Sequence, residues 1–332
     1  MNSNSTQAGR GSAESPLVLA LKNIGPLKEA SIELGKGLTV LYGLNGTGKT
    51  TVAKALRFLA RLNTGTATAE DAVKLVKRHL KHVLTEKEAG MIAYSTADAE
   101  LEVVCIPDVR GARLRIGEWE RHVAMNEKLL KIDKPKIALL WAAHDSVELH
   151  GIGEQEGCLS MSDLLTPSTF RNIAAHLYDD VMDLYEEVLD EVNKVLETID
   201  YFVEYRDVLY FKKFAHVYIP DEVASGVRRF ALILLTAVLG KKLAEYAKIQ
   251  PVIYIENIED SLDVTLMSTV INILRSKDVI SVVETHSGFP LRAATTRKKM
   301  NYYVFADGKA VRDLKAELFK KEVAEWADVN AL

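Results

Sequence analysis

The residues with the clearest chemical potential lie in one short stretch near the N-terminus. Positions 43–50 read Gly-Leu-Asn-Gly-Thr-Gly-Lys-Thr, which fits the pattern G-x-x-x-x-G-K-[ST] of a phosphate-binding loop. Its glycines let backbone N–H groups face a phosphate chain, and the helix that follows adds its positive N-terminal end. Lys49 is expected to reach the β- and γ-phosphates, and the Thr50 hydroxyl to coordinate Mg²⁺. The stretch therefore predicts a site for a nucleoside triphosphate and its magnesium ion.

The flanking residues supply the elements that must position this loop. The apolar run 38–42 fits a buried strand, and apolar residues recur at helical spacing over 51–59. A strand, a loop and a helix in this order are the context that the motif requires. The residues expected to contact the nucleotide are Asn45, Gly46, Thr47, Gly48, Lys49, Thr50 and Thr51.

The bulk composition is that of an ordinary globular protein of 332 residues, with 48% hydrophobic and 27% charged residues. A net charge of −4 gives no global argument for nucleic acid, so a nucleic-acid surface must be a local patch. Cys105 and Cys158 form no C-x-x-C pair, which argues against a disulfide framework or zinc site and favours a reducing, cytoplasmic environment. No apolar run approaches the ~18–20 residues of a membrane span, so no membrane insertion is expected.

The order of the elements favours a parallel α/β sheet, because strand and helix patterns alternate along much of the chain. Three short strand patterns, at 91–94, 100–106 and 112–116, follow one another without a helix between them and predict an antiparallel flank. Apolar residues recur at steps of three and four from 171 to 200, which predicts one long helix.

Three further regions complete the organisation expected from the sequence. Residues 1–16 are rich in Ser, Asn and Gly without an apolar core, so we expect a disordered tail rather than a secretory signal. A helical lobe is expected at about 155–205. Residues 311–332 are expected to form a C-terminal helix packed on or near the main domain.

Further polar stretches follow the loop in a fixed order. The turn at Ser225-Gly226 precedes a helix, and its hydroxyl and backbone N–H groups can donate to a phosphate. The buried strand 251–255 ends in Glu256, where a carboxylate can hold the Mg²⁺ water shell beside Thr50. A polar turn then leads through Asp263 into a helix, and a later strand is followed by His286.

In this order the motifs resemble those of ABC-type ATPases of the RecF/SMC-like branch, close to the small OLD-related ATPases. Asn45-Gly46 within the loop is typical of that group, and residues 21–27 resemble its N-terminal hairpin. The resemblance covers about residues 17–310, which are expected to form the ATPase domain. It implies a P-loop NTPase fold of the ABC/SMC-head type, with a mixed sheet, an antiparallel flank and a helical lobe.

The resemblance also implies a role for each motif. Residues 224–228 match the Ser-Gly signature, Glu256 the Walker B acid, residues 260–263 the D-loop, and His286 the switch histidine. In the family, two protomers pack head to tail with ATP between them. We therefore expect the phosphate loop of one copy to face Ser225, Gly226 and Asp263 of the other.

One position departs from the family pattern in a way that matters for chemistry. Asn257 stands where the family has its general-base glutamate, and an amide cannot accept a proton. Either Glu259 or Glu256 supplies the base, or hydrolysis is slow and ATP-bound dimers are long-lived. We expect weak but real hydrolysis.

Two other family features are altered. No clear Q-loop is present, and the candidates are Gln155, His144 and Asp145. The signature has Val227 and Arg228 where the family has a second Gly and a Gln. Contacts from the second copy are therefore less firmly implied than the phosphate loop itself.

Partners are suggested by local basic patches. Four cations fall on one stripe of a predicted helix: Lys74, Lys77, Arg78 and Lys81. A solvated helix face is the ordinary explanation, and a phosphate backbone or acidic partner the alternative. A second patch comprises Arg292, Arg297, Lys298 and Lys299. Because only 46 residues follow His286, a nuclease partner is expected on a separate chain.

These observations support an ATPase that acts with DNA or a nuclease partner in DNA repair, chromosome maintenance or defence. One alternative is the ATPase subunit of a transporter, which the altered signature and absent Q-loop disfavour. Another is a non-hydrolysing module whose interactions depend on ATP, which Asn257 favours.

Overall fold

The computed structural model describes the chain from residue 16 to residue 312, apart from short gaps. The described ranges are 16–76, 89–97, 99–106, 111–116, 118–124, 127–133, 136–152, 157–174, 181–206, 208–246, 249–276, 279–296 and 300–312. Several predictions fall outside these ranges: most of the tail, the C-terminal helix, Gln155, Lys77, Arg78, Lys81 and residues 297–299. Within the described part, no helix is both long and apolar enough to cross a membrane.

A mixed sheet of fourteen strands dominates the described fold. Its centre is parallel, in the order β8, β14, β15, β3 and β16. These strands span Ile137–Ala142, Gln250–Ile255, Ile280–Thr285, Gly37–Tyr42 and Met300–Ala306. Every residue of β3, β8 and β15 is buried, as expected for parallel strands with both faces covered. The predicted parallel α/β core is confirmed.

Antiparallel strands extend this core on both sides. Beyond β16 the strand order is β17, β2, β1, β4, β5, β6 and β7. These strands span Lys309–Val311, Leu27–Leu34, Leu17–Ile24, Gly90–Ser95, Glu100–Ile106, Gly111–Ile116 and Trp119–Ala124. β17 pairs parallel with β2, and the rest pair antiparallel with their neighbours. β9 and β10, at Ser146–His150 and Gly157–Ser160, extend the other end. The predicted flank is confirmed, and β7 lengthens it.

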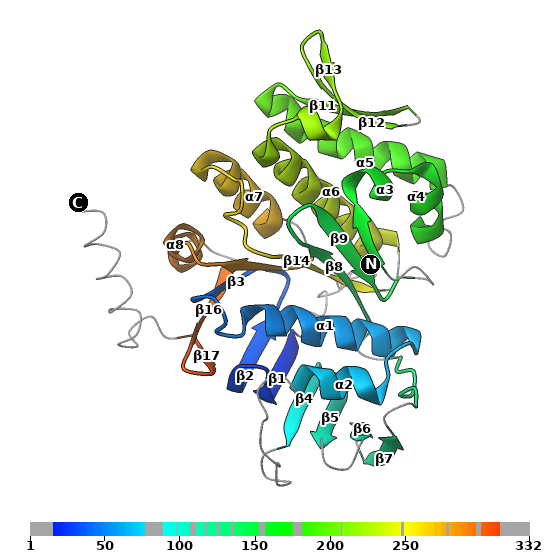
Figure 1. Ribbon diagram of the computed structural model, residues 1–332, viewed down its shortest axis with the longest axis vertical. Helices are drawn as coiled ribbons and strands as arrows, with labels where there is room; N and C mark the ends of the chain where they lie inside the picture. Colours follow the sequence, from blue (N-terminus) through cyan, green and yellow to red (C-terminus); the bar gives the residue numbers. More distant parts are fainter. Residues whose placement is uncertain are drawn as a thin grey trace, which may run out of the picture.

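Helices cover both faces of the central strands (Figure 1). On one face, α1 (Lys49–Thr64) and α2 (Ala69–Val76) bury their apolar residues against alternate residues of the strands. On the other, α5 (Val181–Leu196), α6 (Ser225–Tyr246) and α7 (Val264–Ser276) form a second core with the remaining strand residues. α8 spans Gly288–Thr296 and contacts β3 and β16. The phosphate loop thus joins a central strand, β3, to a helix that covers one face of the sheet.

The predicted helix over 171–200 differs from the structure. α4 begins earlier, at Pro167, and is described to Ala174, after the short α3 at Met161–Leu164. α5 is described from Val181 and continues as a 3₁₀ turn, Glu197–Ile199, which ends where Asp200 adopts φ 63°. A left-handed residue at this point ends a helix by turning the chain away.

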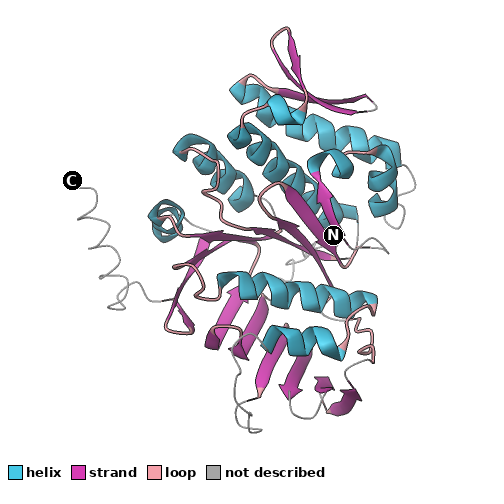
Figure 2. Cartoon of the chain, viewed as in Figure 1, coloured by secondary structure: helices cyan, strands magenta, loops and turns pink. Residues whose placement is uncertain are grey.

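A small antiparallel sheet follows α5 at the end of the helical layer (Figure 2). Its strands are β11 (Phe202–Arg206), β12 (Val208–Lys213) and β13 (His216–Tyr218). Asn193 of α5 hydrogen-bonds both the N–H and the carbonyl of Val203, at 2.7 and 2.9 Å. This amide therefore fixes the sheet on the helix. A short 3₁₀ turn at Pro220–Glu222 then leads into α6.

Candidate functional site

The phosphate loop connects the end of β3 to the start of α1. Gly48 adopts φ 109°, and a Cβ there would lie 2.6 Å from the side chain of Leu27. The loop therefore needs glycine at this position for both its backbone angle and its close approach to β2. The strand–loop–helix context predicted from the sequence is confirmed.

Lys49 lies inside the curve of this loop and is 2% exposed. Its ammonium group donates to the carbonyl oxygens of Gly43 and Leu44, at 2.7 and 2.9 Å. The Glu284 carboxylate is 3.9 Å away. Hydrogen bonds between two charged groups are stronger than those to a neutral carbonyl. The Lys49 ammonium can therefore exchange its present bonds for bonds to an anionic phosphate.

Thr50 is held by a residue that the sequence reasoning did not select. Its hydroxyl lies 2.9 and 3.0 Å from the two carboxylate oxygens of Glu284. The hydroxyl of Tyr254 lies 2.8 Å from Glu284 Oε2 and 3.0 Å from the Lys49 carbonyl. Burial raises the pKa of Glu284, against the hydrogen bond from Tyr254 and the charge of Lys49. The sequence signal that could have identified Glu284 is a carboxylate at the end of a buried strand pattern.

Glu256 follows β14 and approaches the same site from the next strand. The indole N–H of Trp141 donates to Glu256 Oε2 at 3.2 Å. Arg229 of α6 donates to the backbone carbonyls of Glu256 and His144, at 2.6 and 3.1 Å. Arg229 is 2% exposed, and burial lowers its pKa to about 10. These contacts fix the turn after β14 against α6 and the end of β8.

The predicted catalytic residues meet at the ends of β14 and β15. The Nε2 of His286 lies 3.1 Å from Asn257 Oδ1, and its Nδ1 lies 2.8 Å from the Gly43 carbonyl oxygen. Glu259 accepts from the backbone N–H of His286 at 2.6 Å and from the Thr285 hydroxyl at 2.7 Å. Both oxygens of Glu259 thus hold the segment that carries His286.

The predicted contacts from a second copy lie apart from the phosphate loop. Ser225, Gly226 and Asp263 are not among the residues that line the pocket around Lys49. A Cβ on Gly226 would lie 2.5 Å from the Ser261 carbonyl oxygen, so the start of α6 packs closely on the turn before α7. Asp263 caps α7 by accepting from the backbone N–H of Leu266 at 2.8 Å.

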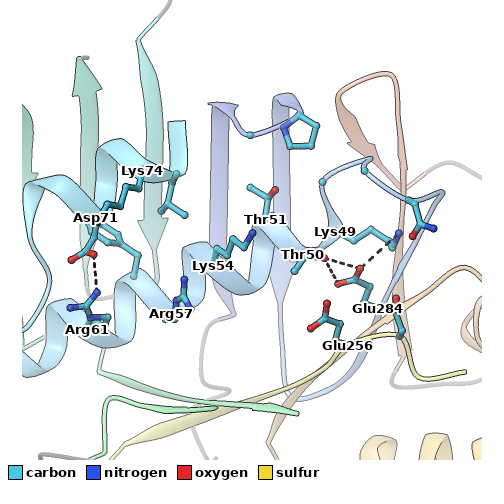
Figure 3. A pocket seen from close by; sticks show the side chains of 18 residues that line it. Lys49, Thr50, Thr51, Lys54, Arg57, Arg61, Asp71, Lys74, Glu256 and Glu284 are labelled. Atoms are coloured by element: carbon cyan, nitrogen blue, oxygen red, sulfur yellow. Dashed lines mark hydrogen bonds and ion pairs between the residues drawn. The ribbon is translucent and has the colours of Figure 1, made fainter. Parts of the chain in front are cut away.

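The pocket has a volume of about 720 Å³, within the range of ligand sites. Figure 3 shows its basic side along α1, formed by Lys49, Lys54, Arg57 and Arg61, with Glu256 and Glu284 near Thr50. An anionic ligand with a bound cation fits this charge pattern, so the residues suit ATP and Mg²⁺. The remaining lining residues are Gly25, Pro26, Asn45, Gly46, Gly48, Thr50, Thr51, Phe58, Asp71, Lys74, Leu75 and Asn257.

Of the predicted basic stripe, the structure describes Lys74, which lines the pocket and pairs with Glu70 at 3.0 Å. Arg292 of the second patch is exposed on α8. The Q-loop candidates His144 and Asp145 are exposed in the turn between β8 and β9, 3.7 Å apart. The His144 carbonyl accepts from Arg229, so this turn is connected to α6.

Comparison with known proteins supports the fold. Residues 19–81 match the family model of AAA domains. No curated protein matches the chain in sequence. Similar solved structures include three that are matched over nearly their whole length. One is an SMC head bound to the C-winged helix domain of ScpA, at TM-score 0.56 and 14% identity, covering 90% of this chain and 97% of that one.

The second is the recombination mediator RecF with ATP, in the RecFOR pathway, at TM-score 0.51 and 13% identity over 90% and 100% of the two chains. The third is the Pyrococcus furiosus Smc head with an extended coiled coil, bound to the C-terminal domain of ScpA, at TM-score 0.50 and 11% identity, covering 94% of this chain and 100% of that one. The predicted ABC/SMC-head fold is confirmed. The narrower resemblance to OLD-related ATPases stays a prediction.

Proposed function

We propose that the chain binds ATP with Mg²⁺ in the pocket around Lys49 and hydrolyses it slowly. The observation that carries this proposal is the arrangement of four groups at one point: a buried ammonium inside the phosphate loop, the Thr50 hydroxyl, and two carboxylates, Glu256 and Glu284. Lys49 would neutralise the phosphate chain, and Thr50 with a carboxylate would hold the ion. Bound Mg²⁺ would neutralise charge on the phosphates.

For the general base, the contacts favour Glu256 over Glu259. Glu259 is not among the residues that line the pocket, and both of its oxygens accept hydrogen bonds, from Thr285 and from the His286 N–H, which stabilise its ionised form and lower its basicity. Glu256 lines the pocket and receives one hydrogen bond, from Trp141. Asn257 contacts His286 and would orient polar groups near the γ-phosphate without accepting a proton.

A head-to-tail dimer with ATP between its copies accounts for the separation of the motifs. Ser225, Gly226 and Asp263 lie outside the pocket of their own chain, so they would serve the pocket of a second copy. Two apolar side chains beside these motifs are exposed: Leu44 in the phosphate loop at 59%, and Val264 at the start of α7 at 60%. A partner surface would cover both.

The partner of this ATPase would be DNA or a separate nuclease chain, in repair, chromosome maintenance or defence. The fold shared with SMC heads and RecF supports this class of function, and the basic patches that include Lys74 and Arg292 are the candidate DNA contacts. The second candidate is an ATP-dependent interaction module without hydrolysis, which the amide at Asn257 favours.

The test is light scattering on the chain with ATP and Mg²⁺, with and without DNA, together with phosphate release. The proposal expects a shift from monomer to dimer on adding ATP, and slow release. A chain that stays monomeric with ATP and Mg²⁺ contradicts the dimer, and dimerisation without release selects the interaction module.

A further inference from the structure

We infer that Glu284, on β15, is the carboxylate that positions Thr50 for the magnesium ion, and that Glu256 is thereby left to act as the general base. This inference rests on the proposed function and assigns roles within the same site. The sequence motif alone places both the magnesium carboxylate and the general base at the end of β14. With Glu284 serving the magnesium site, Glu256 can accept the proton although Asn257 replaces the usual glutamate.

The strand order gives the first reason. β15 lies directly beside β3, and Glu284 is paired in register with Leu41, two residues before the phosphate loop. β14 is one strand further away and pairs with β15 rather than with β3. The strand order therefore places a side chain at the end of β15, rather than one at the end of β14, beside the start of α1.

The hydrogen bonds at Thr50 give the second reason. A hydroxyl carries one hydrogen and two lone pairs, so donating that hydrogen to Glu284 leaves lone pairs for a cation. Partners of this kind, one step behind a metal ligand, orient the ligand and raise its affinity for the metal. Tyr254 and the start of α1 fix Glu284 in turn, because the Tyr254 hydroxyl contacts both Glu284 and the Lys49 carbonyl.

Burial gives the third reason. Glu284 is 4% exposed, and a carboxylate so deeply buried is kept only where donors and a cation surround it. Thr50, Tyr254 and Lys49 supply them. Glu256 is only partly buried, and among the described residues Trp141 is the one side chain that hydrogen-bonds its carboxylate. It therefore keeps an oxygen for a water molecule, as a base requires.

The experiment compares Glu284→Gln with Glu256→Gln in the full chain. A fluorescent ATP analogue is titrated in excess Mg²⁺ and again in EDTA, and the ratio of the two affinities is the gain from Mg²⁺. Phosphate release is measured alongside. Glu284→Gln is expected to reduce the gain about 10- to 100-fold while leaving the affinity in EDTA unchanged. Glu256→Gln is expected to keep the gain and lose phosphate release.

Two further variants serve as a control and as a second test of the role of Glu284. Glu33→Gln, which changes an exposed carboxylate on β2, is the matched control and should keep the wild-type gain. Tyr254→Phe removes the hydroxyl that holds Glu284 but keeps the ring, so it should reduce the gain to a smaller extent. It also provides the test if thermal unfolding shows that Glu284→Gln is not folded.

The outcomes distinguish failure of the roles assigned to Glu284 and Glu256 from failure of the proposed ATP binding. An unchanged gain in folded Glu284→Gln, or an equal loss of gain in Glu256→Gln, overturns the assignment while ATP binding by the wild-type chain stands. If Glu284→Gln is unfolded, an unchanged gain in Tyr254→Phe overturns it. A wild-type chain that binds no ATP overturns the proposed function itself.

Discussion

Replacing Gly48 by alanine tests whether the phosphate loop has the conformation described above. The new methyl group would lie 2.6 Å from both the Cγ and a Cδ of Leu27, a buried side chain of β2. Gly48 also adopts φ 109°. The backbone angle costs an L-residue about 1–2 kcal/mol, and the overpacking costs about 1–3 kcal/mol. We therefore expect Gly48→Ala to lower the free energy of unfolding by about 2–5 kcal/mol.

Gly46→Ala is the matched control in the same loop. Gly46 has φ 77°, but a Cβ there would meet no atom within 4 Å. Its alanine variant should therefore lose only the backbone contribution, about 1–2 kcal/mol. Urea unfolding followed by circular dichroism gives both values.

A double-mutant cycle with Leu27→Ala isolates the steric contribution. Leu27→Ala alone removes a buried side chain and should cost about 2–5 kcal/mol. It also opens the space that the Gly48→Ala methyl needs, so the double variant should lose less than the sum by at least about 1 kcal/mol. Strict additivity, or equal losses in Gly48→Ala and Gly46→Ala, would refute the described packing of the loop on β2.

Three further predictions follow. Asn257→Glu should leave the rate of phosphate release unchanged, because the inferred base is Glu256; a raised rate would mean that the amide limits hydrolysis and would contradict the role of Glu256. Glu148 has a pKa below its ordinary 4.5, because the hydrogen bond from His150 lowers it, and so does Arg57, against burial. Its stabilisation should be present above about pH 4.5 and disappear as pH falls through the folded-state pKa, so Glu148→Gln should differ most from wild type in unfolding free energy at pH 6 and least at pH 3. Asn193→Ala leaves the Val203 N–H and carbonyl without these partners and should cost about 2–4 kcal/mol in urea unfolding, whereas a loss under 0.5 kcal/mol would mean that water replaces the amide.

The sequence was sufficient for features that depend on local pattern. The phosphate loop, the buried strands around it and the helix from 227 onward each follow from the types and spacing of neighbouring residues, and the structure contains them. The order of the motifs along the chain also pointed to the fold, because each motif closes a strand or opens a helix.

What the sequence could not provide is which strands become neighbours. Glu284 contacts Thr50 because β15 lies between β14 and β3, and no local pattern encodes that order. Trp141 and Arg229 were missed for the same reason, since each acts on Glu256 from an element distant in the chain. The single helix predicted over 171–200 was wrong in its continuity, because the structure has two helices, α4 and α5, which pack against each other. Apolar spacing continues from one helix into the next, so periodicity does not report the division.

Isothermal titration with ATP and Mg²⁺ shows whether the pocket around Lys49 binds ATP. Lys36→Ala is the matched control, because Lys36 is exposed just before β3, at the end of that strand away from the loop. Wild type and Lys36→Ala should each bind one ATP per chain. Lys49→Ala should bind ATP with an affinity lower by about 10- to 150-fold, the equivalent of a charged hydrogen bond of about 1.5–3 kcal/mol. Equal affinities in wild type and Lys49→Ala, or no binding by wild type, would contradict ATP binding in this pocket.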